Sequence, residues 1–121
     1  MMPTSAPPMI SAWEALDWER VANTFSEEGL LQTVPAPPFI GRAAIRDHLL
    51  EVASGIEKLS FRIKHLVASN GVVTFERFDE FTYRGKESSV PVVGIMEVEN
   101  GKISQWREYF DMATMVRAMT P

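Results

Sequence analysis

The sequence predicts an α+β fold in which helices pack on one face of a curved antiparallel sheet. Over the first half of the chain, apolar residues recur at the spacing of amphipathic helices, whereas from Leu59 onward they recur at every second residue, as in strands. Helices followed by a run of strands are typical of α+β domains. The length of 121 residues and the apolar content of 45% fit one domain, expected over residues 11–121, with a core large enough to contain a pocket.

The N-terminal region is expected to contain a tail and one amphipathic helix. The opening stretch MMPTSAPPM is rich in proline and small residues, so residues 1–10 are predicted to be disordered or extended. Ser11 and Glu14 have the spacing of a capping box, which predicts a helix start. The apolar residues at helical spacing are Trp13, Leu16, Val21, Ala22 and Phe25.

A proline-rich segment separates this helix from a second one. Three prolines between Val34 and Gly41 exclude a regular helix, so the segment LLQTVPAPPFIG is predicted to be rigid and irregular. Beyond it, apolar residues at helical spacing mark a second helix, which we expect to end at Gly55. These residues are Ile45, Leu49, Val52 and Ile56.

Four strands are predicted in the second half of the chain: LSFRIKHLVAS, VVTFERFDEFTY, SVPVVGIMEV and KISQWREYFD. Turn signals separate them at Asn70–Gly71, along the polar tract Arg84–Ser88 and at Asn100–Gly101, so we expect an antiparallel meander. The segment after Asp111 is predicted to be a short amphipathic helix whose methionines either cap a pocket or pack against a partner chain. These methionines are Met112, Met115 and Met119.

The composition excludes several classes of function. The formal net charge is -4 and the lysines and arginines are scattered along the chain, which argues against nucleic-acid binding. There are no cysteines and only two isolated histidines, so we expect no disulfide and no metal site. Because neither a long apolar run nor a signal-peptide pattern is present, we expect a soluble, cytoplasmic protein without a membrane partner.

Charged residues lie on the more apolar face of the strand VVTFERFDEFTY. This face carries Val73, Phe75, Arg77, Asp79, Phe81 and Tyr83. If it is the inner face, Arg77 and Asp79 point into the protein. A charge there needs a partner, because the loss of its hydration costs several kcal/mol.

The last strand can supply that partner. When Trp106 and Phe110 point inward, Glu108 enters the same interior and meets Arg77; the opposite orientation of this strand is the alternative. Two carboxylates that share one cation unequally tend to titrate at different pH values, which suits a general acid and base pair. A purely structural ion network is the other interpretation.

The segments FERFDEF, VPVVGIMEVENGKISQWREYFD and LQTVPAPPFIGRAAI resemble the limonene-epoxide hydrolase family, a branch of the SnoaL-like and ketosteroid-isomerase-like group. The similarity runs from about Trp18 to Phe110 and keeps the order of the segments. It implies a cone-shaped α+β barrel, with a curved antiparallel or mixed sheet wrapped around N-terminal helices, and a homodimer. It also implies hydrolysis of an epoxide on a small lipophilic substrate to a vicinal diol, without a metal or organic cofactor.

The resemblance assigns roles to three residues. In that family one carboxylate activates water, the water attacks the epoxide, and a second carboxylic acid protonates the ring oxygen, with an arginine between the two. By position, Arg77 is the bridging arginine, Asp79 the general acid and Glu108 the general base, where the family has aspartate. Leu31 and Thr33 stand where the family holds its water with a tyrosine and an asparagine, and only Thr33 can bind water.

Further residues are assigned to the pocket and its surroundings. The predicted substrate-binding residues are Leu31, Thr33, Phe75 and Trp106. His65 is expected to be a core histidine held by a neighbour, with a place in the pocket as the alternative, and His48 is expected to face solvent. Two functions stay open besides hydrolysis: another acid and base reaction in the same pocket, such as an isomerisation or an epoxide-opening cyclisation, and non-catalytic binding of a small molecule.

Overall fold

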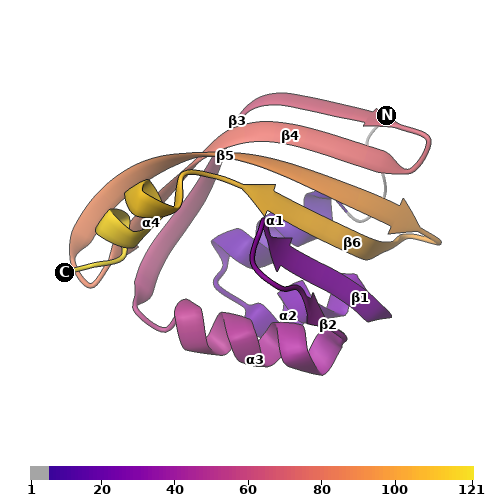
Figure 1. The fold of residues 1–121 in the computed structure, drawn as a ribbon, viewed down its shortest axis with the longest axis horizontal. Coiled ribbons are helices and arrows are strands. Elements are labelled where there is room, and N and C mark those ends of the chain that lie inside the picture. The colour runs from indigo at the N-terminus through magenta and orange to yellow at the C-terminus, as the bar shows by residue number, and fades with distance from the viewer. Residues whose placement is uncertain (1–5) are drawn as a thin grey trace.

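In the computed structural model, which describes residues 6–121, six strands form one curved sheet (Figure 1). They are β1 (Phe25–Thr33), β2 (Phe39–Ile40), β3 (Ile56–Ser69), β4 (Val72–Tyr83), β5 (Lys86–Glu99) and β6 (Lys102–Tyr109). Their order is β2-β1-β6-β5-β4-β3, and every pair is antiparallel except β1 with β6. Because β2 and β3 stand at the two ends of this order, the sheet is mixed and curved as predicted, but it stays open and does not close into a barrel.

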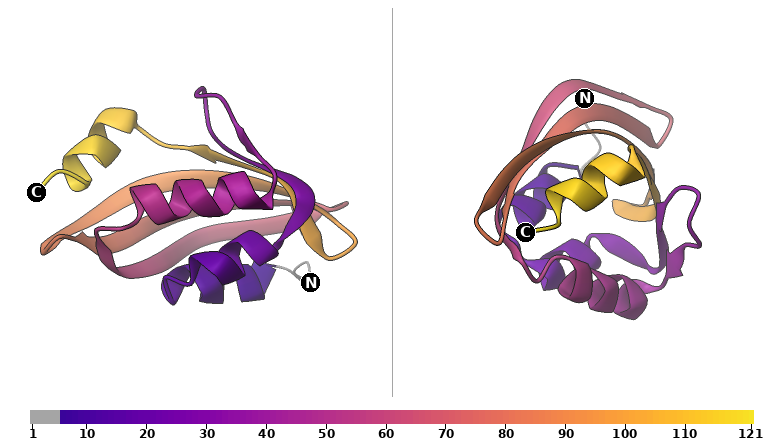
Figure 2. Two further views of the ribbon diagram at one scale, coloured as in Figure 1. Left: turned by 90° about the horizontal axis from the view of Figure 1, so that it is seen from below. Right: turned by 60° about the vertical axis from the view of Figure 1, so that its left-hand side comes forward.

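Helices cover the concave side of the sheet. Those in the described residues are α1 (Ala6–Glu14), α2 (Trp18–Asn23), α3 (Arg42–Val52) and α4 (Met112–Ala118). The first three pack below the sheet, and α4 lies across one end of it (Figure 2). The predicted α+β class, with helices on one face of a curved sheet, is confirmed.

The predicted meander of β3 to β6 is present. Each of its hairpins turns through two residues with positive φ, at Asn70–Gly71, Arg84–Gly85 and Asn100–Gly101. Two such residues form the tight turn whose twist matches that of the flanking strands, and Asn and Gly adopt it at little cost. These turns connect β4, β5 and β6, of which β4 and β6 carry the charged residues of the interior.

The N-terminal prediction was wrong in two respects. Residues 1–5 lie outside the described part of the chain, but α1 begins at Ala6, and Met9 is fully buried, so residues 6–10 are not an extended tail. Ser11 lies inside α1 and caps nothing, while the Glu14 carboxylate accepts a hydrogen bond of 3.0 Å from the backbone N–H of Phe61. Leu16, with φ of 56°, separates α1 from α2.

Two strands, β1 and β2, were missed between the two predicted helices. Phe25 begins β1 rather than extending a helix, and the prolines are confined to the loop between β1 and β2. A shift in the pairing of β1 with β6 between Phe25 and Leu30 breaks the alternation that would have marked this strand. Beyond the shift, Leu31 lies beside Trp106 and Thr33 beside Glu108.

The second predicted helix ends earlier than expected. α3 finishes at Val52 rather than Gly55, and Ile56 already belongs to β3, where it pairs with Tyr83. A Cβ on Gly55 would lie 2.5 Å from the Tyr83 ring, so close packing on that ring, and not a helix cap, explains the glycine. Helix α3 therefore turns directly into the edge strand.

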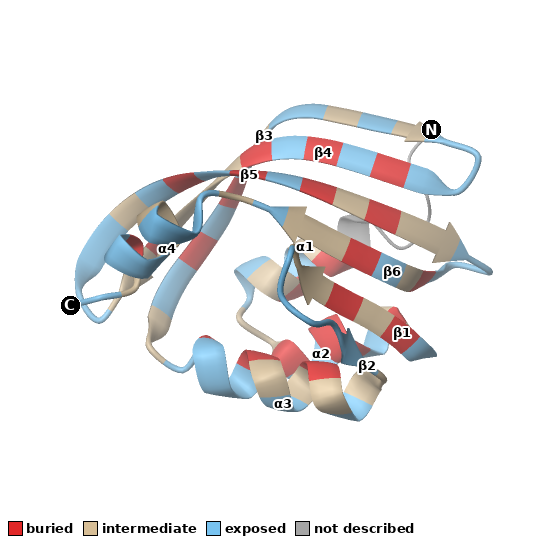
Figure 3. Cartoon of the chain, in the orientation of Figure 1, coloured by how far each residue is buried: buried red, intermediate tan, exposed pale blue. Residues whose placement is uncertain are grey.

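The core lies between the concave face of the sheet and the helices (Figure 3). Buried residues alternate along β4 and β5, as a sheet with one buried face requires. Trp106 is fully buried at the centre, with ring centroids of Trp13 at 5.3 Å and of Phe25 and Phe75 at 6.0 Å. No helix within residues 6–121 is long and apolar enough to cross a membrane.

The convex face of the sheet carries several exposed apolar side chains. They are Val67, Val72, Val93 and Tyr109. Exposed apolar patches are typical of protein–protein interfaces, and the homodimer expected from the sequence stays a prediction.

Burial of Met9 makes the position of α1 testable. We expect Met9→Ala to lower the free energy of unfolding by about 2–5 kcal/mol, because the substitution leaves a cavity in the core. Val116→Ala on the exposed side of α4 is the control and should change stability by about 0.5 kcal/mol or less. Chemical denaturation measures both, and a Met9→Ala protein as stable as the control would contradict the packing of α1.

Candidate active site

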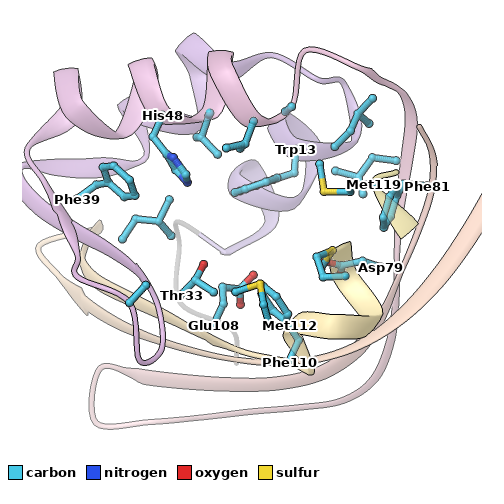
Figure 4. Close-up of a pocket in the computed structure, with 18 of the residues that line it drawn as sticks. Trp13, Thr33, Phe39, His48, Asp79, Phe81, Glu108, Phe110, Met112 and Met119 are labelled. Carbon is cyan, nitrogen blue, oxygen red and sulfur yellow. The ribbon is translucent and has the colours of Figure 1, made fainter. Parts of the chain in front are cut away.

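A mostly apolar pocket of about 430 Å³ opens on the concave side of the sheet (Figure 4). Its walls come from β1, the loop after it, α3 and α4, and its lining includes Leu31, Phe39, Leu49, Phe61 and Phe81. Apart from the Trp13 indole, its polar side chains in the described residues are Thr33, His48, Asp79 and Glu108. A few polar groups in an apolar cavity of this size are typical of small-molecule sites.

The charged residues converge as the sequence predicted. Arg77 on β4 is 1% exposed, and its Nε and Nη2 donate to the two oxygens of Asp79 at 2.7 and 3.2 Å. Its Nη1 donates to Glu108 Oε2 at 3.1 Å, and Nη2 also donates to Glu108 Oε1. Asp79 and Glu108 keep 14% and 12% of their side chains exposed and both line the pocket. One buried cation therefore joins two carboxylates that a ligand can reach.

Gly94 makes room for this arrangement. Strand β5 lies between β4 and β6, and Gly94 is opposite Phe75 on one side and Glu108 on the other. A Cβ at Gly94 would stand 2.7 Å from Glu108 Oε2 and 2.8 Å from Arg77 Nη1. The carboxylate of Glu108 therefore reaches Arg77 across a strand that has no side chain at that point, which a glycine within a predicted strand could have suggested.

Aromatic rings support the guanidinium. The ring centres of Phe61 and Phe75 each lie 4.6 Å from the guanidinium carbon of Arg77, within the range of cation–π attraction. Phe75 is fully buried and does not line the pocket, so its predicted contact with substrate is wrong. It faces the same side of β4 as Arg77 but lies deeper, beneath the charged group.

Trp106 positions Glu108. Its indole Nε1 donates a hydrogen bond of 2.9 Å to Glu108 Oε2. The inward face predicted for β6 is confirmed, since Trp106 is fully buried and Glu108 and Phe110 line the pocket. Trp106 itself does not reach the pocket, so its predicted role as a substrate contact is also wrong, and it orients the carboxylate from below.

The environment favours a proton on Asp79. Burial raises the pKa of Asp79 from 3.8 to about 6, the neighbouring Arg77 opposes this shift, and the charge of Glu108 adds to it. Although burial alone lowers the pKa of Arg77, the carboxylates of Glu108 and Asp79 raise it above its usual value, so the guanidinium stays charged. Glu108 accepts hydrogen bonds from Arg77 and Trp106 and is held as an acceptor. The site can therefore both donate and accept a proton.

Two predicted substrate contacts lie at the site. Leu31 and Thr33 both line the pocket, because alternate residues of β1 point to the same face. Thr33 pairs with Glu108 across the β1–β6 ladder, and the two side chains lie close together in Figure 4. The hydroxyl of Thr33 is thus available beside the carboxylate, whereas Leu31 offers an apolar surface.

Both histidine predictions were wrong. His48 lines the pocket instead of facing solvent, and its ring stacks on Phe39 at 3.9 Å. Its position on α3, next to buried Leu49, was the signal that could have placed it. His65 is exposed on β3 and contacts the Glu76 carboxylate at 2.9 Å, outside the pocket and outside the core.

The methionines of α4 complete the pocket. Met112, Met115 and Met119 all line it, as one of the two predicted positions requires, and their packing against a partner chain stays a prediction. Lys86 Nζ donates to the backbone oxygens of Arg117 and Thr120 at 2.6 and 3.3 Å and ties the end of α4 to β5. Within residues 6–121, no group of three His, Cys, Asp or Glu side chains is arranged to hold a metal ion.

The role of Gly94 can be tested by one methyl group. We expect Gly94→Ala to lower the free energy of unfolding by about 1–3 kcal/mol, because the added carbon forces Glu108 and Arg77 apart. The control is Ser89→Ala on the same strand, for which a change of about 0.5 kcal/mol or less is expected. Equal stabilities of the two variants in urea denaturation would contradict the close approach at Gly94.

Comparisons with known proteins agree with this architecture. An LEH-like epoxide hydrolase from M. tuberculosis is 20% identical, with a TM-score of 0.81 over 97% of this chain and 87% of that chain. A hypothetical protein with a ketosteroid isomerase-like fold from Catenulispora acidiphila is 16% identical, with a TM-score of 0.85 over 100% of both chains. A proposed SnoaL-like polyketide cyclase from Shewanella denitrificans is 16% identical, with a TM-score of 0.83 over 95% and 93%.

At these identities the solved structures establish the fold, a ketosteroid isomerase-like cone, and not the activity. The family is established by the sequence itself. The model of the SnoaL-like domain matches residues 8–106, which include α2, α3 and strands β1 to β5 and end inside β6 at Trp106. The chain therefore belongs to the SnoaL-like domain family.

Proposed function

We propose that this protein hydrolyses an epoxide on a small lipophilic substrate to a vicinal diol by one-step general acid and base catalysis. The observation that carries the proposal is the buried guanidinium of Arg77, which joins Asp79 and Glu108 at the bottom of an apolar pocket. The sequence resemblance to limonene-epoxide hydrolases and the structural likeness to an LEH-like epoxide hydrolase support it.

Asp79 is the proposed general acid. A carboxyl group with a pKa of about 6 still holds its proton in a useful fraction of molecules near neutral pH. Its exposed part faces the pocket, so it can meet the ring oxygen of an epoxide. Arg77 holds it in place through two hydrogen bonds and stabilises the negative charge that develops when the proton leaves.

Glu108 is the proposed general base. It takes a proton from a water molecule, the water oxygen bonds to an epoxide carbon, and the C–O bond of the ring breaks with its electron pair on oxygen. Asp79 protonates that oxygen, which gives the diol. The proton then held by Glu108 must return to Asp79 before the next turnover. Thr33 beside Glu108 can hold the water, and the extra methylene of Glu108 is accommodated by its reach across Gly94.

Leu31 favours a second candidate. In place of a polar residue that could hold water, it presents an apolar side chain to the pocket near Glu108. A reaction whose nucleophile belongs to the substrate, such as an epoxide-opening cyclisation, needs no bound water and uses the same acid and base. The likeness to a proposed polyketide cyclase is compatible with this alternative.

A panel of terpene, styrene-type and fatty-acid epoxides tests the proposal. We expect turnover of at least one epoxide by the wild type, and a loss of about 10²–10⁴-fold in Asp79→Asn and in Glu108→Gln, because each variant lacks one proton-transfer group. Glu80→Gln on the same strand, outside the pocket, is the matched control and should keep full activity.

Product analysis in ¹⁸O-labelled water separates the two candidates. Hydrolysis incorporates solvent oxygen into a diol, whereas cyclisation gives an ether without it. Absence of turnover across the panel would refute epoxide opening as the activity and leave the apolar pocket as a binding site.

The pH dependence tests the role of Asp79. Its pKa lies near 6, so the proton that it must donate is present below this pH and is lost above it. We expect kcat/KM to fall as the pH rises through about 6, and to approach a tenfold decrease per pH unit well above it. Unfolding curves at each pH show whether the protein stays folded. A kcat/KM that is constant or rises between about pH 5 and about pH 8 would show that Asp79 is not the acid.

A further inference from the structure

The pocket contains a polar group that the acid and base pair does not use. His48 enters from α3, on the side of the cavity opposite Glu108 (Figure 4). Its ring is half-buried and stacks on Phe39, but among residues 6–121 no side chain or backbone group forms a hydrogen bond or an ion pair with it. The ring therefore offers a ligand one N–H donor and one nitrogen acceptor.

The charges around the pocket restrict what that ligand can be. Within the described residues, no lysine or arginine lines the cavity, and Arg77 lies beneath it with its donors directed at Asp79 and Glu108. Burial lowers the pKa of His48, while Glu51 on the same helix opposes the shift, so the imidazole is neutral at physiological pH. An anionic ligand would meet two carboxylates and no free cation.

We propose that His48 forms a hydrogen bond with a hydroxyl or carbonyl group of a neutral ligand, at the end of the pocket away from Asp79 and Glu108. The substrate class is then an uncharged lipophilic molecule with two polar ends, one at the acid and base pair and one at His48. This inference rests on the proposed function only for the nature of the reacting end, since recognition by His48 needs no turnover.

Three probes with one carbon skeleton isolate the polar end: p-cymene, cuminyl alcohol and cuminate, which carry a methyl, a hydroxymethyl and a carboxylate group. Equilibrium dialysis at neutral pH gives their Kd values. We expect the alcohol to bind about 2–10-fold more tightly than the hydrocarbon, as one neutral hydrogen bond allows, and cuminate to bind more weakly than the alcohol. Tighter binding of cuminate, or equal binding of alcohol and hydrocarbon, would overturn the proposal.

Variants of the two histidines then locate the hydrogen bond. His48→Phe keeps an aromatic ring against Phe39 and should abolish the preference for the alcohol, while His48→Gln, which retains a donor and an acceptor, should restore part of it. His65→Phe on the outside of the sheet is the control and should leave the preference unchanged. A preference that persists in His48→Phe would place the hydroxyl at the acid pair and refute the role of His48.

The binding experiment and the epoxide assay fail independently. If the preference depends on His48 but no epoxide is opened, recognition by His48 stands and epoxide hydrolysis is refuted. If epoxides are opened but the preference is absent or independent of His48, the proposed function stands and the role of His48 is refuted.

Discussion

The buried guanidinium of Arg77 is the interaction on which the site depends. Removal of this charge from water costs several kcal/mol, and only full pairing can offset the cost. Asp79 and Glu108 accept hydrogen bonds from all three of its nitrogens, and the rings of Phe61 and Phe75 lie against it. Neither carboxylate can move far without leaving the cation unpaired, so the charge that is costly to bury also fixes the distance between the two acids.

The net charge of the group formed by Arg77, Asp79 and Glu108 explains why its two carboxylates differ. With both carboxylates ionised, one positive and two negative charges leave a net charge of about -1 in a region of low dielectric, whereas a proton on Asp79 makes the group neutral. Glu108 has an additional donor in Trp106, and Asp79 has no such partner among the described residues. Glu108 is therefore held by more hydrogen-bond donors, while burial raises the pKa of Asp79.

The features that the sequence predicted correctly are those that alternation along a strand determines, namely the face on which each side chain lies. The inward faces of β4 and β6 followed from the period of two, and the meeting of Glu108 with Arg77 followed from the need to pair a buried charge. The parallel pairing of β1 with β6 was not visible, because its partners are far apart in sequence and a register shift breaks its alternation. Phe75 and Trp106 were placed at the correct face but at the wrong depth, since alternation gives direction and not distance from a cavity.

The ion group lies on strands of the sheet, whereas much of the pocket wall comes from other elements of the fold. Arg77, Asp79 and Glu108 lie on strands that tight turns connect, and hydrogen bonds hold the two carboxylates on one guanidinium. Leu31, His48 and the methionines in and after α4 come from other elements, line the pocket and form none of the hydrogen bonds of the ion group. They can change without disturbing the ion group, so in the proposed reaction the strands would carry the proton transfer and the surrounding walls would select the nucleophile and the substrate. In the proposed hydrolysis, a polar side chain at position 31 would help to hold the water, whereas the leucine present there offers water no hydrogen bond and leaves Asp79 and Glu108 unchanged.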